Sequence, residues 1–334
     1  MFQTYARPCS TRPSGDYMSA GETKDAGPVP VLIDTDIGDD IDDAFCLTLA
    51  FMLHRDRKIN LLCVTTSGKG SHEERAGLVK RLQVAILGEQ VIPIFKGSTD
   101  GESKRNYMSE ALPGQFPKFE SSVLSVAEMI RNQTQKVLVI CIGPLDNVRH
   151  LVDAITDPSK VRLCLMGGSF FKSFDAQPPQ IAEYNVRKNI ENWRHVVSHM
   201  DALIIPLDVA GDARLKDWPR RLQKLLPEFR DMYLKWYSSV LDRDGLGSRI
   251  LAGTMPIGER PILPGQVSSV MFDAVALCIA LNPDTAVLSR SAVQVTDDGF
   301  TNMVEGSHKV DVALSWHPSF NFTTWCDQIA NVSI

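Results

Sequence analysis

The sequence predicts an α/β fold in which a mostly parallel central sheet is flanked by helices. Three observations support this fold class. Short apolar runs recur between residues 29 and 208, and they are unbroken rather than alternating, as expected for strands covered on both faces. Segments with apolar residues at helical spacing lie between these runs. Polar residues and glycines follow most of the runs, where the carboxyl ends of parallel strands would form one rim.

Six predicted strands precede residue 210 and share an apolar interior. They are VPVLID (29–34), INLLCVTT (59–66), VIPIF (91–95), KVLVICI (136–142), VRLCLMG (161–167) and DALIIPLD (201–208). Helical patterns between them include residues 71–89 and 119–133. Strand and helix alternate, as in a Rossmann-like, doubly wound domain.

The pattern changes after Pro206. Residues 213–282 are predicted to be mostly helical, and residues 292–306 contain short strand-like pieces around a turn. Because no flexible linker separates these segments from the rest, we expect a mainly helical C-terminal extension of one domain spanning residues 29–334. Residues 1–28 are polar, contain Gly and Pro and lack the apolar stretch of a signal peptide, which predicts a disordered leader.

Composition excludes several classes of partner. The chain has 334 residues, is 44% hydrophobic and carries a formal charge of −5, with no dense run of Lys and Arg, so no nucleic-acid partner is expected. No apolar stretch reaches the roughly 18 to 20 residues that span a bilayer, so no membrane partner is expected. The seven cysteines form no CxxC pair. Most lie in apolar segments, which predicts reduced, buried thiols and a cytoplasmic location.

The first predicted strand ends in a dense acidic segment. Six aspartates occur within ten residues, at positions 34, 36, 39, 40, 42 and 43. A hard cation such as Ca²⁺ takes oxygen ligands and would relieve the repulsion among these carboxylates. In a simpler interpretation, Asp39, Asp40 or Asp42 interacts with the N-terminus of a helix that starts near Ile41. An EF-hand loop does not fit, because a loop counted from Asp34 would have Asp at position six and Phe at position twelve.

Three motifs together resemble the nucleoside hydrolase family, the inosine-uridine type of N-ribohydrolase. They are DTDIGDDIDDA (34–44), CIGPLDN (141–147) and PPQIAEYN (178–185), and the resemblance runs in the family's order from about residue 30 to 330. The opening motif contains two extra residues, which we assign to Asp39 and Asp40. The resemblance implies a Ca²⁺ cofactor and hydrolysis of the N-glycosidic bond of small-molecule ribonucleosides to ribose and free base. Relatives that form dimers and tetramers suggest a homodimer or homotetramer.

The resemblance also implies a set of metal ligands. Asp36 corresponds to a ligand that serves as the general base, and Asp43 to a bidentate ligand. The main-chain carbonyl of Ile142 precedes the GPLDN turn, where the family has another ligand. Asp273 opens a late helix and corresponds to the last ligand, although Asp is also favoured as a simple helix cap. Asp39 or Asp40 could take one of these roles, because the insertion leaves the register open.

The predicted sugar contacts combine carboxylates and amides. Asp42 corresponds to the contact with the ribose hydroxyls. The family's N-x5-E-x-N pattern is matched by Glu183 and Asn185, with Gln177 in place of the first Asn. Carboxylates accept hydrogen bonds and amides both accept and donate them, which suits the two hydroxyls of a vicinal diol.

The sequence departs from the family at the leaving base. Phe272 stands where many members have a His, so no residue is assigned to protonate the base. Tyr233 and Trp236 could stack on the base, although core packing explains them equally well. Lys69, near where the family has a Gly-Asn pair, could contact an anionic group such as a phosphate, or could point to solvent as Lys usually does.

Two further functions stay open at this level. The first is a binding protein that keeps the Ca²⁺ and ribose sites, or recognises an ADP-ribose-like molecule, but has lost efficient turnover. The second is a Mg²⁺-dependent phosphatase of the haloacid dehalogenase type, in which Asp34 of the DTD motif would be the nucleophile. The GPLDN and IAEYN motifs have no role in such a phosphatase.

Overall fold

The structure is a computed structural model. It describes residues 27–68, 71–97, 107–174, 176–215, 226–243 and 269–330. Almost all of the predicted leader and the whole of Lys69 lie outside these residues. The single-domain boundary at residue 29 stays a prediction.

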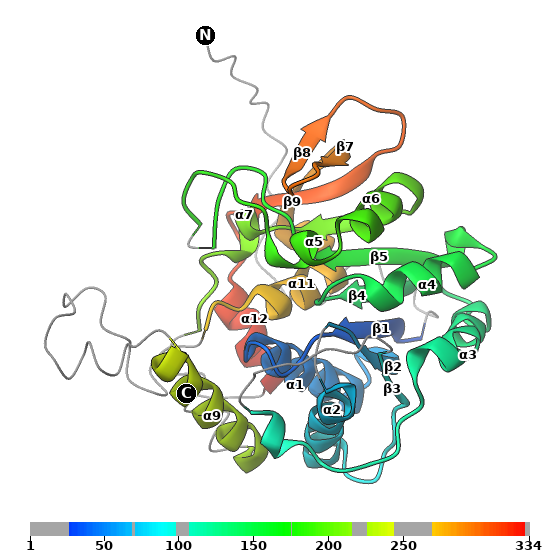
Figure 1. Cartoon of the computed structure of the whole chain (residues 1–334), viewed down its shortest axis with the longest axis vertical. Coiled ribbons are helices and arrows are strands. Elements are labelled where there is room, and N and C mark those ends of the chain that lie inside the picture. The colour runs from blue at the N-terminus through cyan, green and yellow to red at the C-terminus, as the bar shows by residue number, and fades with distance from the viewer. Residues whose placement is uncertain are drawn as a thin grey trace, which may run out of the picture.

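Within the described residues, nine strands form one sheet in the order β3-β2-β1-β4-β5-β6-β9-β7-β8. The strands are β1 (Val29–Thr35), β2 (Ile59–Thr66), β3 (Ile94–Lys96), β4 (Val137–Cys141), β5 (Val161–Met166), β6 (Ala202–Ile205), β7 (Ala286–Val295), β8 (Thr301–Val304) and β9 (Val310–Trp316). Strands β1 to β6 run parallel to one another and β9 runs parallel to β6, whereas β7 runs antiparallel to β8 and β9. In Figure 1, β7 and β8 lie at one end of the molecule and β3 towards the other.

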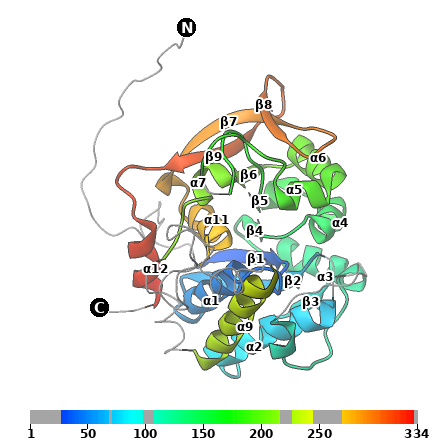
Figure 2. The same ribbon diagram turned by 60° about the vertical axis from the view of Figure 1, so that its left-hand side comes forward.

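Helices cover both faces of the sheet and create two hydrophobic cores. One core involves α1 (Asp42–Arg55), α2 (His72–Leu87), α9 (Pro227–Arg243), α11 (Phe272–Leu281) and α12 (Phe322–Ala330). The other involves α3 (Phe119–Arg131), α4 (Asp146–Ala154) and α6 (Ile190–His199). Figure 2 shows α4 and α6 on one side of β4 and β5 and α11 on the other. The short helices are η1 (Met108–Glu110), η2 (Pro158–Lys160), α5 (Tyr184–Lys188), α7 (Leu207–Ala210) and η4 (Pro283–Thr285).

The two cores explain why the strands read as unbroken apolar runs. Val31 and Ile33 of β1 belong to the first core, whereas Leu32 between them belongs to the second. Successive side chains of a strand point to opposite faces, so a strand buried on both faces has no polar side. The α/β fold class predicted from these runs is confirmed.

The strand order places a ligand crevice between β1 and β4. From β1 the chain adds β2 and then β3 in one direction, and it then returns to add β4, β5 and β6 on the other side of β1. At such a reversal the connections leave the sheet in opposite directions, which opens a crevice outside the carboxyl ends of the two strands. Asp34 pairs with Cys141 at this point, so Asp36 and Ile142 follow at the crevice.

The C-terminal region combines helices with three more strands. Helices α9 and α11 agree with the predicted helical extension, while residues 244–268 lie outside the described residues. The strand-like pieces at 292–306 form the β7–β8 hairpin. Strand β9 is not among the predicted strands, and it pairs with β6 and β7 within the main sheet. The extension therefore completes the sheet and contributes α11 to the first core.

None of the described helices has both the length and the apolar composition needed to cross a lipid bilayer. The six described cysteines are free and buried, as predicted from the apolar segments that carry them. Burial raises the pKa of these thiols above the usual range, and the thiolate is the reactive form of cysteine. Their positions are 46, 63, 141, 164, 278 and 326.

We expect these six thiols to be unreactive in the folded protein. A Cys9→Ser variant removes the one cysteine outside the described residues. Its folded form should react negligibly with Ellman's reagent over the time in which a denatured sample reacts completely. Rapid reaction of the folded variant would show that one of these cysteines is accessible.

Candidate active site

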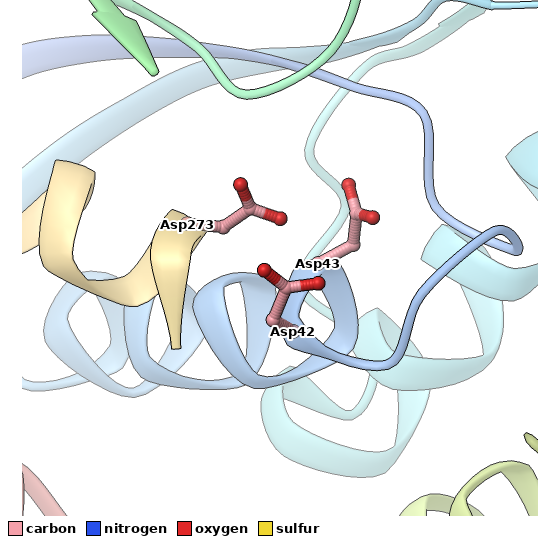
Figure 3. A group of neighbouring side chains, drawn as sticks. All are labelled: Asp42, Asp43 and Asp273. Carbon is pink, nitrogen blue, oxygen red and sulfur yellow. The ribbon is translucent and has the colours of Figure 1, made fainter. Parts of the chain in front are cut away.

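Three buried carboxylates meet at the crevice. One oxygen from each of Asp42, Asp43 and Asp273 lies within 4.8 Å of the other two. Asp42 and Asp43 begin α1, and Asp273 lies in the first turn of α11. Figure 3 shows the three carboxyl groups directed towards one space between the starts of these helices. The partial positive charge at a helix N-terminus favours carboxylates in the first turn, so two helices support the cluster.

Local hydrogen bonds hold the start of α1 against the end of β1. The Thr35 hydroxyl donates to the Asp43 carboxylate, and the Ile37 amide donates to Thr35 Oγ1 at 3.1 Å. Thr35 thus connects the turn that follows β1 with the first turn of α1. This places the Asp43 carboxylate beside the end of the strand.

The cluster has the chemistry of a hard-cation site. Burial, followed by repulsion from neighbouring aspartates, raises the pKa of Asp42, Asp43 and Asp273 well above the usual range. A bound divalent cation would reverse this effect, because it favours the ionised form of each carboxylate. A set made of oxygen atoms fits Ca²⁺ or Mg²⁺ better than a soft metal.

Asp36 and Ile142 lie in the wall of a cavity of about 840 Å³ that the three clustered aspartates also line. Burial, and then the charges of Asp39 and Asp34, raise the pKa of Asp36 to about 8, although the nearby Arg75 guanidinium lowers it. Among the described residues, the three-carboxylate group contains Asp42, predicted as a sugar contact, and does not contain Asp36.

Gly143 allows the turn after β4 to approach Asp36. A Cβ atom at Gly143 would lie 2.7 Å from the Ser67 Oγ and 2.9 Å from both the amide nitrogen and Oδ1 of Asp36. The Asn147 amide of the same turn donates to Asp34 Oδ1 and to the Thr66 carbonyl, each at 2.8 Å. The GPLDN motif thus connects β4 to the ends of β1 and β2.

Glu183 and Asn185 reach the same cavity from the start of α5. Glu183 caps this helix and accepts backbone hydrogen bonds from Asn185 at 3.0 Å and from Gly168 at 3.1 Å. The Asn185 amide donates to the carbonyls of Ile142 at 3.4 Å and Met166 at 3.3 Å. The predicted sugar residues and the predicted carbonyl ligand therefore lie next to one another.

Aromatic side chains form the apolar part of the cavity. Trp236, Phe174 and Phe272 line it, and the rings of Phe174 and Phe272 meet edge to face with centroids 6.0 Å apart. Tyr233 is 1% exposed and packs in the core against Phe229, so the structure does not bring it to the cavity. Gln177 is exposed and is not among the residues that line the cavity.

Several residues of the site were not identified from the sequence. Phe174, Tyr184 and Arg214 line the cavity. Arg75 is fully buried behind the acidic turn, and Tyr107, the residue that precedes η1, contacts the same turn. The sequence does indicate that Arg75 is buried, because it shares a helical face with apolar residues of α2 at spacings of three and four. Tyr184 begins α5 within the PPQIAEYN motif, whereas Tyr107, Phe174 and Arg214 lie outside helices and strands, where no period marks them.

Comparison with known proteins identifies the family. The sequence model described as "Inosine-uridine preferring nucleoside hydrolase" matches residues 31–329. The chain belongs to the nucleoside hydrolase family. The match covers β1 to α12 and therefore includes every element that contributes to the cavity.

The individual proteins and solved structures that this chain resembles are distant in sequence. The pyrimidine-specific ribonucleoside hydrolase RihA of Salmonella typhimurium is 26% identical over 156 residues, which are 42% of this chain and 49% of the relative. The alignment thus spans about half the length of RihA. An inosine-uridine preferring nucleoside hydrolase from Bacillus anthracis has a TM-score of 0.64 at 15% identity, over 90% of this chain and 99% of that chain. Type III effector protein XopQ, solved with adenosine diphosphate ribose, has a TM-score of 0.68 at 14% identity, over 91% and 93%.

Membership of the nucleoside hydrolase family does not favour the phosphatase alternative. The position of Asp34 also argues against a phosphatase. Asp34 is fully buried and is not among the residues that line the cavity, which a nucleophile would have to reach. Its Oδ1 accepts hydrogen bonds from the Thr65 hydroxyl and the Asn147 amide. Asp34 therefore has a structural role beneath the site.

We expect Asp34 to make the free protein less stable as the pH rises. Burial raises the pKa of Asp34 to about 7, whereas an aspartate in the unfolded chain titrates near pH 4. The folded protein keeps a proton that the unfolded chain loses, so this contribution to stability is complete below about pH 4 and is lost as the pH rises through 7. An Asp34→Asn variant stays neutral. In EDTA, its Tm should rise relative to wild type between pH 5 and 8.5.

An Asp56→Asn variant serves as the control, because Asp56 is an exposed aspartate that pairs with Arg55 at 2.9 Å. Its Tm should follow that of the wild type across the same pH range. Parallel Tm curves for wild type and Asp34→Asn would contradict the assigned pKa of Asp34.

We also expect a divalent cation to displace protons from the site. The pKa of each clustered carboxylate is raised, so the free site holds protons that an incoming cation must release. Affinity for the cation should therefore increase as the pH increases. Calorimetric titration with Ca²⁺ in two buffers of different ionisation enthalpy would measure the proton release, and equal apparent enthalpies in the two buffers would contradict it.

Proposed function

We propose that this protein hydrolyses the N-glycosidic bond of ribonucleosides, releasing ribose and free base, with Ca²⁺ as its cofactor. The convergence of the Asp42, Asp43 and Asp273 carboxylates beside a cavity carries this proposal, in a chain that belongs to the nucleoside hydrolase family. RihA and the Bacillus anthracis protein are named as nucleoside hydrolases, which supports the same activity here. A cytoplasmic location and a homodimeric or homotetrameric assembly stay predictions from the sequence.

The carboxylates of Asp36, Asp43 and Asp273 and the carbonyl of Ile142 would hold the cation, and Asp42 is close enough to contribute an oxygen as well. When bound, Ca²⁺ supplies positive charge that orients and acidifies a water molecule. Ca²⁺ accepts carboxylate and carbonyl oxygens in flexible geometry, which suits a site built from two helix starts and a turn.

Asp36 would act as the general base. In the free site burial raises the pKa of Asp36 to about 8, and a bound cation would lower this pKa, so that the carboxylate is ionised and can accept a proton near pH 7. Asp36 would take a proton from the water molecule that attacks the anomeric carbon of the ribose. Gly143, with no side chain, keeps the space beside the Asp36 carboxylate open.

Glu183 and Asn185 would orient the ribose. Both line the cavity within the same turn of chain, with a carboxylate acceptor and an amide that donates and accepts. As the glycosidic bond breaks, the ribose gains oxocarbenium character, and the surrounding carboxylates stabilise the positive charge.

The base would bind against the aromatic part of the cavity. Trp236, Phe174 and Phe272 present apolar ring surfaces to it. Stacking of a base on aromatic side chains does not require a specific hydrogen bond, so these residues contribute affinity for more than one base. Phe272 cannot donate a proton, so the proton for the departing base comes from another group or from solvent.

The test is a reducing-sugar assay with a panel of ribonucleosides, including inosine and uridine. Wild type with Ca²⁺ should release ribose, and EDTA should abolish the release. Asp36→Asn should lower kcat by about 10²- to 10⁴-fold, the usual contribution of a general base. The exposed control Asp56→Asn should retain wild-type activity.

The panel also includes nucleoside 5′-monophosphates and ADP-ribose, because the one cationic side chain among the described residues that line the cavity is Arg214. Ca²⁺ binding without ribose release from any compound would contradict the proposed hydrolase. It would favour the alternative of a binding protein on the same fold.

A further inference from the structure

We propose that Asp39 is a positioning residue that joins the metal-binding turn to the sugar-binding loop, through Arg75 on one carboxylate oxygen and Tyr184 on the other. The inference rests on the proposed function, because the proposed function assigns one half of the cavity to the metal and the other half to the sugar. Asp39 is one of the two residues inserted into the acidic motif. The insertion therefore has a defined role in this chain.

Asp39 bridges two segments that are far apart in the sequence. Its Oδ1 accepts a hydrogen bond from the Arg75 guanidinium at 2.8 Å, and its Oδ2 accepts one from the Tyr184 hydroxyl at 3.3 Å. The Asp39 side chain is 15% exposed and lines the cavity, whereas the Arg75 side chain is completely buried. One carboxylate thus contacts helix α2 on one side and the start of α5 on the other.

Arg75 holds the backbone of the turn as well as the Asp39 side chain. One guanidinium nitrogen donates to the carbonyl of Asp36 and, at 2.7 Å, to the carbonyl of Ile37. Removing a guanidinium from water is costly, and these hydrogen bonds offset part of that cost, so they favour the observed path of the turn. Arg75 thereby helps to position the Asp36 backbone.

Tyr107 holds the other side of the insertion. Its hydroxyl accepts a hydrogen bond from the Gly38 amide at 2.8 Å and donates to the Asp40 carbonyl at 2.5 Å. Gly38 has a φ of +113°, a conformation that residues with a Cβ rarely adopt. The turn before α1 is thus held by Arg75 from α2 and by Tyr107, the residue that precedes η1.

Tyr184 connects this turn to the sugar-binding loop because it lies between Glu183 and Asn185. The Lys188 ammonium lies 5.0 Å from the centre of the Tyr184 ring, which helps to orient the ring. A shift at Tyr184 would move the neighbouring side chains that bind ribose. Small errors in the distance between reacting groups cost large factors in rate, so the bridge links metal position to sugar position.

Tyr184→Phe is the decisive variant, because it removes one hydroxyl and changes no charge. We expect it to weaken Ca²⁺ affinity by about three- to tenfold, within the range of coupling between contacting residues, although Tyr184 is not a predicted ligand. We also expect kcat for the best ribonucleoside to fall by about tenfold or more, with a smaller change in KM. Calorimetric titration with Ca²⁺ and steady-state kinetics measure the two effects.

Asp39→Ala and the double variant test whether the two residues act together. Asp39→Ala removes both hydrogen-bonding oxygens and should lower Ca²⁺ affinity and kcat, and adding Tyr184→Phe should lower them no further, because the bridge is already broken. Asp56→Ala is the matched control for the loss of one carboxylate and should behave as wild type. Denaturant unfolding of each variant separates loss of positioning from loss of the fold.

The proposed bridge would be overturned if Tyr184→Phe kept the Ca²⁺ affinity and the kcat of the wild type. It would also be overturned if the losses caused by the two single substitutions multiplied in the double variant. If the wild type binds Ca²⁺ but releases no ribose, the hydrolase proposal fails while the Ca²⁺ titrations still test the bridge. In that case Ca²⁺ should increase the affinity for D-ribose in wild type more than in Tyr184→Phe.

Discussion

Repulsion among buried carboxylates is the constraint on which the rest of this structure depends. Asp36, Asp42, Asp43 and Asp273 all lie at the carboxyl rim of the sheet with little or no exposure to solvent. Removing a charge from water is costly, and like charges at short range add to that cost. The fold is therefore compatible with these residues only if protons, a cation or neighbouring dipoles compensate for them.

The protein provides compensation from several directions. Helices α1 and α11 direct their N-termini at the cluster, the Thr35 hydroxyl donates to Asp43, and the buried Arg75 guanidinium lies behind the turn. The doubly wound order of strands then determines where these elements meet, because it separates the connections between β1 and β4. The site is thus a consequence of the topology and of the charges together.

Several polar groups serve the fold and the site at once. Glu183 caps α5 through backbone hydrogen bonds while its side chain lines the cavity, and Asn185 contacts the Ile142 carbonyl while facing the same space. Such sharing keeps the site rigid before a ligand arrives, since each side chain already has a hydrogen-bonded position. It also means that substitutions there affect stability and function together.

The sequence by itself determined the α/β class, six strands with small errors at their ends, and the acidic and GPLDN motifs that follow them. These features are local, because a strand buried on both faces needs an unbroken apolar run and a motif is read from neighbouring residues. Only the tertiary structure decided that β9 enters the sheet beside β6, that Tyr233 packs in the core, and that Arg75 and Tyr184 meet at Asp39. Those contacts join segments separated by tens of residues. Packing of the whole chain brings the segments together, and such packing produces no periodic pattern in the sequence.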